Sequence, residues 1–387
     1  MRIEKLYYRN HITGWELAPM KFGDVNLLVG VSGVGKTRIL EAIRSLQKIA
    51  FGIIHNSNRI LNGIEWDVTF STSSDYQYRW HGKFNMVDNE DYTIDEFSEK
   101  TYLRIDQDKP EIEVEELYLN HDLVACRNDG VIKFQDVIMP KLSQSESLIK
   151  IFQSEERILP IIMGLRSIVD SQVQRPERFV GSSMPDLAKG LSLSGIRNIN
   201  GTLVDRLGLL QINYRQMFDI IKSSFIDIFP QVEDFRLLME QTSFQYDDRL
   251  RPVFSLEIKE IGVDRWITQS NLSMGLLKTL VHITEIHLLA EGSILLIDEF
   301  ENSLGVNCID VVTELLNDRK DIQFIITSHH PYIINKIPMQ HWKIITRKGS
   351  VVTATNATDY EELSGSRHKV FTQLINLPEY TDGIQVG

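Results

Sequence analysis

The sequence predicts an α/β fold in which a core of strands and helices is split by a long inserted region. Two parts of the chain predict the core. An apolar strand at 25–29 runs through a glycine-rich turn into a helix that begins at Thr37. Helix, strand, helix and strand then follow one another between 276 and 326. The stretch between these parts shows no internal repeat and no heptad run, so we expect a compact insertion.

The N-terminal part reads as strands around one helix. Apolar residues after the glycine turn recur at helical spacing, at Ile39, Ile43, Leu46 and Ala50. Between 63 and 135 apolar and polar residues alternate, which predicts a β-rich lobe. Asn128-Asp129-Gly130 predicts a hairpin turn in that lobe, and the acidic stretch 84–100 predicts a surface loop.

The rest of the chain divides into a helical stretch and a second α/β stretch. We expect three parts: an N-terminal lobe at 1–144, a helical insertion at 145–232 and a C-terminal lobe at 233–387. Within the last part the patterns predict, in order, strands at 233–268, a helix at 276–290, a buried strand at 294–297, a helix near 308–317, a strand at 324–326 and a hairpin around Lys348-Gly349.

Bulk properties restrict the class of protein. The formal net charge of -12 argues against a surface that coats nucleic acid generally, although a local basic groove stays possible. The two cysteines, Cys126 and Cys308, form no disulfide or zinc pattern, which indicates a reducing cytoplasm. No apolar run approaches the roughly 20 residues of a membrane helix, so we expect neither export nor a membrane span.

The strongest motif is GVSGVGKT at Gly30–Thr37, which fits the P-loop pattern G-x-x-x-x-G-K-[ST]. Glycines let successive backbone N–H groups surround phosphate oxygens, and the following helix N-terminus adds a positive dipole. Lys36 would reach the β- and γ-phosphates, and the Thr37 hydroxyl would ligate Mg²⁺. The expected nucleotide-binding residues here are Gly30, Ser32, Gly33, Val34, Gly35, Lys36, Thr37 and Arg38. A glycine turn without ligand is disfavoured because the required strand and helix flank it.

A second motif ends the apolar strand Ile294–Ile297 with two adjacent carboxylates, Asp298 and Glu299. Sheets of α/β proteins place ligands at the carboxyl ends of their strands. Asp298 is expected to hold Mg²⁺ through water, and Glu299 to act as the general base on the attacking water. An apolar string followed by acids is weak evidence alone, but it is strong downstream of a P-loop.

Two further elements complete the constellation. Leu272-Ser273-Met274-Gly275 stands immediately before a helix, where Ser273 is also a plausible N-cap. After the strand 324–326 comes Thr327-Ser328-His329-His330-Pro331. A lone histidine is usually structural, but its place directly after this strand favours a functional reading of His329.

These four segments, VNLLVGVSGVGKTRILEAI, LSMG, ILLIDEFENSL and FIITSHHPYII, resemble the OLD-type and SMC-like branch of ABC-type ATPases. RecF and the stand-alone ATPases of bacterial anti-phage systems such as Septu and PARIS are similar. The resemblance covers roughly 1–50 and 270–335; the middle matches only in layout. It implies that Ser273 and Gly275 bind the γ-phosphate held by the opposite subunit, and that His329 is the switch histidine.

The resemblance also implies roles for further positions. It implies a D-loop at 301–304, with Asn302 and Ser303 as candidates. Gln144 is our candidate for the Q-loop glutamine that contacts nucleotide and Mg²⁺, with Gln135 and Gln153 competing. Arg9 and Asn10 occupy the place of an Arg-Asn segment that touches nucleotide. The chain departs from the branch at three positions: Ser32 replaces the usual Asn, Leu276 the Gln of a full signature, and Gly305 a His.

Several related functions are disfavoured. Transporter ATPases place the signature closer to the P-loop, and the insertion is too short for the long coiled coil of large SMC proteins. OLD nucleases carry a Toprim domain, for which too few residues follow His329. Glu257-Ile258-Lys259, downstream of Asp247 and Asp248, is the only nuclease-like spacing and is a common accident in strands. A nuclease or toxin effector is therefore expected to be a separate protein.

The leading hypothesis is an ATPase that uses ATP and Mg²⁺, works as a homodimer or higher homo-oligomer and controls a separate effector in an anti-phage system. Lys36, Glu299 and His329 are its candidate catalytic residues, and Thr37, Asp298 and Gln144 its candidate metal contacts. The alternatives are a RecF-like DNA repair factor, for which DNA is a possible partner, and an ATP-locked scaffold with little turnover.

Overall fold

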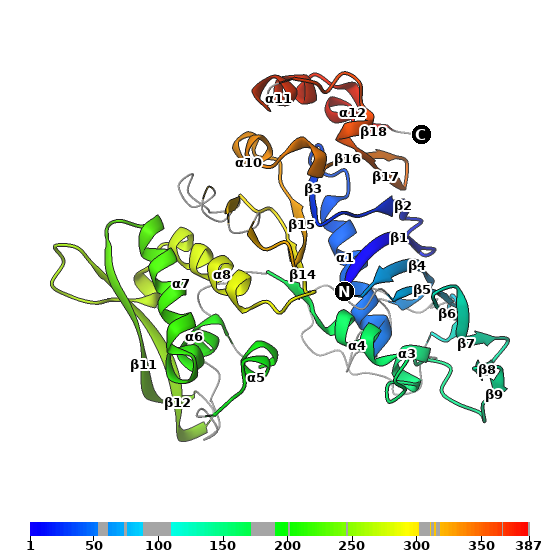
Figure 1. Ribbon diagram of the computed structural model, residues 1–387, viewed down its shortest axis with the longest axis horizontal. Helices are drawn as coiled ribbons and strands as arrows, with labels where there is room; N and C mark the ends of the chain where they lie inside the picture. The colour runs from blue at the N-terminus through cyan, green and yellow to red at the C-terminus, as the bar shows by residue number, and fades with distance from the viewer. Residues whose placement is uncertain are drawn as a thin grey trace, which may run out of the picture.

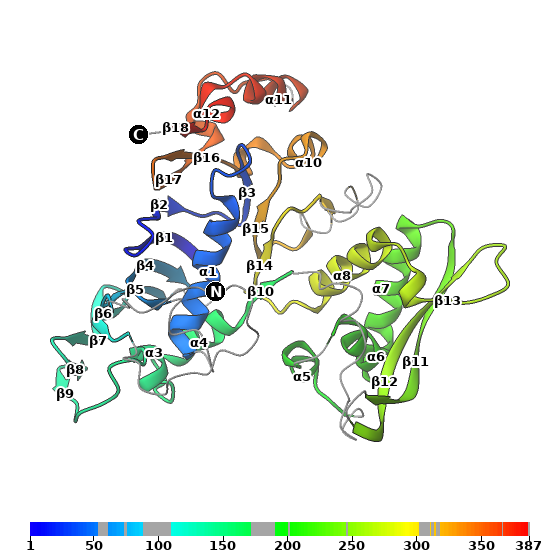
Figure 2. The same ribbon diagram turned by 180° about the vertical axis from the view of Figure 1, so that it is seen from behind.

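The computed structural model describes residues 1–52, 61–72, 76–87, 110–171, 190–199, 202–244, 247–301, 310, 313–314, 318–365 and 367–385. Figure 1 shows them as two parts, a large body that contains both ends of the chain and a smaller lobe made of α5 to α8 with β11 to β13. The view from behind shows the same division (Figure 2).

The large body is built on one mixed sheet of 15 strands in the described residues. One end of it is parallel, in the order β10 (Ile168–Asp170), β14 (Ile294–Ile297), β15 (Gln323–Thr327), β3 (Val25–Val29) and β16 (Trp342–Lys348). Strands β3, β14 and β15 are short and largely apolar, as expected for parallel strands that are covered on both faces. Because the strands are parallel, their carboxyl ends lie at one edge of the sheet. The sequence motifs come directly after these strand ends.

Beyond β16 the sheet continues as a mostly antiparallel wing, in which β17 and β2 pair in parallel. Its order is β17 (Val351–Asn356), β2 (Glu16–Lys21), β1 (Arg2–Asn10), β4 (Ile64–Ser71), β5 (Gln77–Phe84), β6 (Ile112–Leu119), β7 (Asp122–Asn128), β8 (Val131–Phe134) and β9 (Val137–Ile138), while β18 (Ile384–Gln385) pairs with β16. The predicted β-rich lobe is this wing. The predicted hairpin joins β7 to β8, with Asp129 and Gly130 at φ 48° and 75°.

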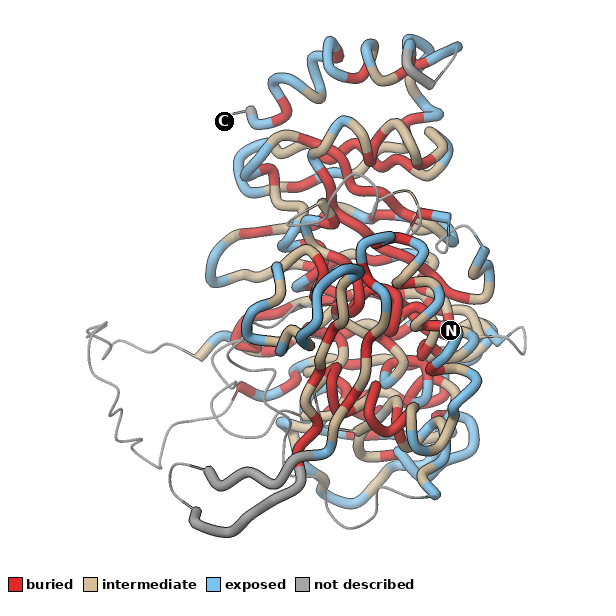
Figure 3. The backbone as a smooth tube through the Cα atoms, turned by 90° about the vertical axis from the view of Figure 1, so that its left-hand side faces the viewer, coloured by how far each residue is buried: buried red, intermediate tan, exposed pale blue. Residues whose placement is uncertain are grey.

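Helices cover both faces of the parallel strands, and side chains alternate between the faces. Leu28, Leu296 and Ile325 share a buried cluster with α1 (Lys36–Phe51). Leu27, Leu295 and Ile326 point the other way, into a cluster with α10 (Pro331–Lys336) and α11 (Arg367–Ile375). The remaining helices of this body are α3 (Leu148–Ile151), α4 (Leu159–Arg166) and α12 (Pro378–Thr381). Figure 3 shows the resulting buried interior between exposed outer segments.

The smaller lobe has a hydrophobic cluster of its own. It consists of α5 (Leu193–Asn198), α6 (Leu203–Asn213), α7 (Arg215–Ile228), α8 (Met274–Leu288), β11 (Val232–Phe244), β12 (Asp247–Glu260) and β13 (Ile267–Thr268). Helix α8 belongs to both parts. Leu276, Leu280 and Ile283 lie in the lobe's cluster, whereas Ile286 packs in the cluster of the parallel sheet.

The clusters divide the chain differently from the predicted boundaries. Residues 148–168 pack with the large body although they fall in the predicted helical insertion, and strands β11 to β13 pack with the helices of that insertion. The insertion also contains a strand, β10, that joins the parallel sheet beside β14. The predicted loop at 84–100 and helix near 308–317 fall largely outside the described residues.

Strand β6 is tied to the start of α3 by a fully buried carboxyl group. Glu115 accepts hydrogen bonds from Trp80 Nε1 at 2.9 Å and from the backbone N–H of Leu148 at 2.9 Å. Arg127, also fully buried, lies 4.0 Å away and donates to the carbonyls of Gln144 and Glu146. Burial raises the pKa of Glu115 to about 7, because desolvation outweighs these favourable contacts.

This pKa predicts a pH-dependent stability. The raised value means that the folded state holds the Glu115 proton more tightly than the unfolded state, so stability is lost as pH rises from 4.5 to about 7. The loss should be about 3 kcal/mol. Glu115→Gln should abolish this component when the free energy of unfolding is measured by urea titration between pH 5 and pH 8. Glu113→Gln, an exposed position on the same strand, is the control and should keep the wild-type slope.

Candidate nucleotide-binding site

The sequence motifs converge at the carboxyl edge of the parallel strands. Strand β3 ends at the P-loop, β14 ends at Asp298, and β15 ends at Thr327 just before His329. Since β14, β15 and β3 are consecutive parallel neighbours, their ends meet although they lie far apart in sequence. This edge is where open α/β sheets bind ligands.

The glycines of the P-loop have steric reasons for their positions. A Cβ at Gly30 would lie 2.7 Å from the carbonyl oxygen of Ile345 on β16, which is too close for any side chain. Gly35 precedes α1 with φ 111°, a backbone conformation that residues with side chains rarely adopt. The loop therefore lies against β16 and turns directly into the helix, with the N–H groups of the first turn of α1 at the site.

Lys36 begins α1 and folds back over the loop. Its Nζ donates to the carbonyl oxygens of Gly30 at 2.7 Å and Val31 at 3.0 Å. Burial lowers the pKa of Lys36, while the negative charges of Glu301, Asp298 and Glu299 oppose that shift. The ammonium group thus stands between the loop and a group of carboxylates.

Asp298 accepts two hydroxyl hydrogen bonds at the same oxygen. Thr37 Oγ1 donates to its Oδ1 at 3.2 Å, and Thr327 Oγ1 donates to the same atom at 2.6 Å. The contact with Thr37 joins the P-loop helix to the acidic end of β14 across 261 positions of sequence. The sequence predicted that Thr37 and Asp298 would lie together as metal contacts. It did not predict the hydrogen bond from Thr327.

Glu299 has an unusual backbone. Its φ is 47°, in the left-handed region, which costs about 1–3 kcal/mol for a residue with a side chain. Its N–H donates to Thr327 Oγ1 at 2.7 Å, and the next N–H, of Phe300, donates to the Thr327 carbonyl. Strained backbones of this kind concentrate at functional sites, where the surroundings hold them.

His329 is oriented by Glu301. The carboxylate Oε1 of Glu301 lies 2.7 Å from His329 Nδ1 and also accepts the His329 backbone N–H at 2.9 Å. The side chain of Glu301 is 9% exposed and that of His329 is 63% exposed. Since Nδ1 is engaged, the Nε2 side of the ring is the part that can meet a ligand. Glu301 was predicted only as the start of a D-loop.

These groups line one cavity of about 290 Å³. Its lining consists of Ser32, Gly33, Gly35, Lys36, Thr37, Arg38, Asp298, Glu299, Thr327, Ser328, His329 and Arg347. Two predicted P-loop residues are absent from this lining: Val34 is buried in the core, and Gly30 lies under Ile345. Arg347 reaches the cavity from β16, and no motif signals it because only the strand pairing brings it there.

The residues fit Mg²⁺. That ion keeps several waters and takes few protein oxygens together with phosphate oxygens, and Thr37 and Asp298 supply a hydroxyl and a carboxylate at adjacent positions. Among the described residues no group of three or more His, Cys, Asp or Glu side chains is placed to hold a metal without phosphate. The donor set therefore suits an ion that arrives with a nucleotide.

Gln144 is not brought to this cavity, and its assignment needs correction. Its backbone carbonyl accepts hydrogen bonds from Ile112 and Arg127, and its side-chain amide donates to the carbonyl of Gly130 at 3.1 Å. All these partners belong to the antiparallel wing. Arg9 and Asn10 are likewise absent from the lining: Arg9 pairs with Glu16, and Asn10 caps a turn at Thr13.

The segment that does reach the edge from the middle of the chain is the end of β10. Asp170 pairs with Arg44 of α1 at 2.7 Å, and burial raises the pKa of Asp170 against the effect of that arginine. Ser171 donates its N–H to Leu296 on β14 and bonds His282 of α8 at 2.9 Å. Gln172 follows in the sequence and lies outside the described residues.

Ser273 and Gly275 lie on the smaller lobe and do not line this chain's own cavity. Ser273 is exposed, and its hydroxyl accepts the N–H of Leu276 as the N-cap of α8. The local capping role anticipated from the sequence is therefore present. Residues 302–309, including the D-loop candidates Asn302 and Ser303, fall outside the described part of the chain.

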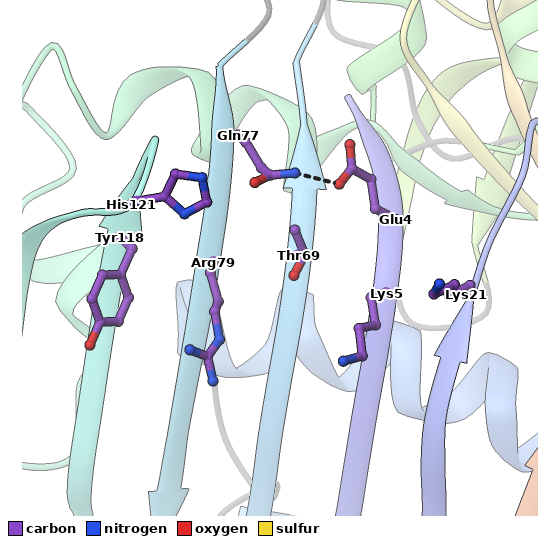
Figure 4. A pocket seen from close by; sticks show the side chains of 8 residues that line it. All are labelled: Glu4, Lys5, Lys21, Thr69, Gln77, Arg79, Tyr118 and His121. Atoms are coloured by element: carbon purple, nitrogen blue, oxygen red, sulfur yellow. Dashed lines mark hydrogen bonds between the residues drawn. The ribbon is translucent and has the colours of Figure 1, made fainter.

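A larger hollow of about 590 Å³ lies on the outer face of the wing, away from the motifs (Figure 4). Lys21, Lys5, Thr69, Arg79 and Tyr118 form a row across five neighbouring strands. Arg79 is already paired with Asp67, and Glu4 contributes a negative charge beside Gln77. This mixed surface has no chemistry in common with the motif site.

Comparison with solved structures decides the fold. The structure described as the SmcHead bound to the C-winged helix domain of ScpA matches with a TM-score of 0.52 and 13% identity, covering 92% of this chain and 97% of the other. The chain has the fold of an SMC head. The SMC head domain from Thermotoga maritima also matches, at TM-score 0.45 and 15% identity, with 92% and 99% coverage.

Two sequence comparisons match parts of the chain. Residues 184–335 match the family described as AAA domain, putative AbiEii toxin, Type IV TA system. A curated relative, the opaque-specific ABC transporter CDR3 of Candida albicans, is 36% identical over 76 residues. That match covers 20% of this chain and only 5% of the transporter. Among the described helices, none combines the length and the apolar character that a membrane span requires.

Proposed function

We propose that this chain binds ATP together with Mg²⁺ and hydrolyses it. The contact between Thr37 and Asp298 carries the proposal, because it places the P-loop helix and the acidic strand end at one point of the cavity. Glycine turns and acidic strand ends are common separately. Their union beside Lys36, Glu299 and His329 is the arrangement that phosphoryl transfer requires.

Each residue has a distinct task in this proposal. The P-loop amides, the N-terminus of α1 and Lys36 bind the phosphates, with Arg38 and Arg347 adding positive charge at the rim. Thr37 and Asp298 hold Mg²⁺, which neutralises developing charge when bound. Glu299 accepts the proton of the attacking water. Glu301 holds His329 by accepting its Nδ1–H, and the doubly protonated ring donates from Nε2 to the terminal phosphate.

The site is completed by a second copy of the chain. Ser273 and Gly275, at the exposed start of α8, supply the opposite wall in a head-to-tail dimer. A helix N-terminus is suited to this task because its N–H groups and dipole favour an anion. ATP then acts as the ligand that shifts the pair toward its closed state.

In the cell we assign the chain to a regulatory role in anti-phage defence, acting on a separate effector. The matching family's description names a putative toxin of a Type IV TA system, which supports a place in such a system but names no separate effector. In the nuclease-like spacing, Glu257 is held by Arg236 through two hydrogen bonds to one oxygen, at 2.9 and 2.7 Å. Phage plating on cells that carry the complete locus, with and without Asp298→Asn, tests the assignment. Equal plating with both, combined with sensitivity of the Asp298→Asn strain to DNA damage, would favour the repair alternative.

Lys36→Ala tests the nucleotide site directly. Loss of a charged donor at the β- and γ-phosphates should weaken ATP binding by about 100-fold, measured by calorimetry. Phosphate release should fall to background. Lys48→Ala, in the last turn of the same helix, is the control and should bind ATP as the wild type does. Equal affinity for the Lys36 variant and the wild type would contradict the site.

A further inference from the structure

Thr327 occupies a position that the motifs do not explain. It is the last residue of β15, and the pairing of Ile326 with Ile297 places it beside Asp298. The strand alternates, so Thr327 shares the face of Ile325, which packs with α1. It is 1% exposed and follows three apolar residues of its strand.

Its single hydroxyl group contacts two consecutive residues. The hydroxyl proton is committed to Asp298 Oδ1 at 2.6 Å, because the other neighbour, the N–H of Glu299 at 2.7 Å, is itself a donor. The bond to the carboxylate is charge-assisted, and its length is typical of that class. Valine would have the same shape but neither bond.

We infer that Thr327 is a positioning residue of the hydrolysis site, whose hydroxyl fixes the Asp298 carboxylate and the Glu299 backbone relative to each other. This inference rests on the proposed function. Glu299 adopts a left-handed backbone, so its direction depends on bonds from outside its own segment. The Thr327 hydroxyl oxygen therefore positions both Asp298 Oδ1, which would hold the metal, and the backbone of Glu299, the proposed general base.

The Thr327 hydroxyl should affect Mg²⁺ binding and phosphate binding differently. Thr37 and Thr327 donate to the same oxygen of Asp298, from α1 and from β15. Thr37 is exposed at the cavity and is the residue expected to turn to Mg²⁺, whereas Thr327 is buried and remains. Removing the Thr327 hydroxyl should thus damage Mg²⁺ use and turnover while leaving the phosphate contacts of the P-loop intact.

Thr327→Val, Thr327→Ala and Thr327→Ser test the inference. With Val and Ala, kcat should fall at least tenfold, roughly the effect of one lost hydrogen bond to a charged group. Ser should restore kcat to within about threefold of wild type, since it keeps the hydroxyl. Affinity for a fluorescent ATP analogue in EDTA should be unchanged in all three. The gain in affinity on adding Mg²⁺ should be lost with Val and Ala only.

Thr284→Val is the matched control. Thr284 is fully buried on α8 and donates to the Leu280 carbonyl, so its variant also loses one buried hydroxyl but touches no carboxylate. Its kcat and Mg²⁺ gain should equal those of wild type. Ala guards against crowding of Asp298 by a Val methyl group, and circular dichroism of each variant confirms folding.

The outcomes separate two failures. Wild-type kcat and Mg²⁺ gain in Thr327→Ala would overturn the positioning role while leaving the ATPase proposal standing. Equal losses in Thr327→Ser and Thr327→Ala would also overturn it, because the hydroxyl would not be the cause. A wild-type chain that neither binds nor hydrolyses ATP would overturn the proposed function and this inference together.

Discussion

Replacing Glu299 with Gln should lower ATP turnover by about 10²- to 10⁴-fold, the range expected for loss of a general base. ATP binding should persist, because the P-loop, Lys36 and Asp298 are unchanged. Glutamine has the same shape and the same need for a left-handed backbone, so the φ of 47° adds no new strain relative to glutamate. Phosphate release and ATP binding, measured on the same preparation, check both statements.

The expected product is a chain that accumulates with ATP bound. Size-exclusion chromatography with ATP and Mg²⁺ should then show a larger dimer fraction for Glu299→Gln than for wild type, since the closed pair is no longer released by hydrolysis. Glu156→Gln, an exposed glutamate beside α4, is the control and should behave as wild type. Wild-type turnover in Glu299→Gln would remove Glu299 as the base.

Ser273→Arg should lower the rate of ATP hydrolysis by about 100-fold or more, while ATP binding to the single chain stays normal. The reason is geometric: Ser273 does not line its own chain's cavity but is exposed at the start of α8. A bulky cation there blocks the second copy. Phosphate release together with ATP binding measures the effect.

The loss of a helix cap needs its own control, because capping alone stabilises by about 1 kcal/mol. Ser192→Arg provides it: Ser192 is an exposed N-cap of α5 in the same lobe, with its hydroxyl accepting from Gly195 at 3.1 Å. This variant should hydrolyse ATP normally. Equal loss of ATP binding in Ser273→Arg would contradict a role across two subunits.

Mixing two inactive chains gives a sharper version of the same test. In a head-to-tail pair of Ser273→Arg with Lys36→Ala, one composite site combines an intact P-loop with an intact Ser273. Turnover should therefore reappear on mixing. If no mixture hydrolyses ATP under conditions where the subunits exchange, the shared site is contradicted.

The sequence predicted those parts of the site that depend on local chemistry. The P-loop requires glycines at fixed spacing before a helix, and α1 begins where that spacing ends. The strand 294–297 was predicted with the bounds of β14, because four consecutive apolar residues between a glycine turn and an acidic pair have few other readings. Such signals are contained within a dozen residues.

The failures all involve pairing between distant segments. Strand β10 has three residues, of which only Ile168 is buried, so it shows no period and was absorbed into a helical stretch. Without it, Gln144 seemed the natural boundary of the wing. Arg347 and Thr327 look like ordinary strand residues, and only register with β3 and β14 reveals what they contact. No local propensity encodes that register.

Helix α8 joins the hydrophobic clusters of the two parts. Ile286, near its C-terminal end, packs with the parallel sheet, while Leu276–Ile283 and Leu288 pack in the cluster of the smaller lobe. Fifteen residues make a rod of about 22 Å, so a tilt of about 10° around the embedded end would swing the Ser273 tip by about 4 Å. A small rotation near the sheet would thus move Ser273 by more than the length of a hydrogen bond, enough to make or break its contact with a ligand.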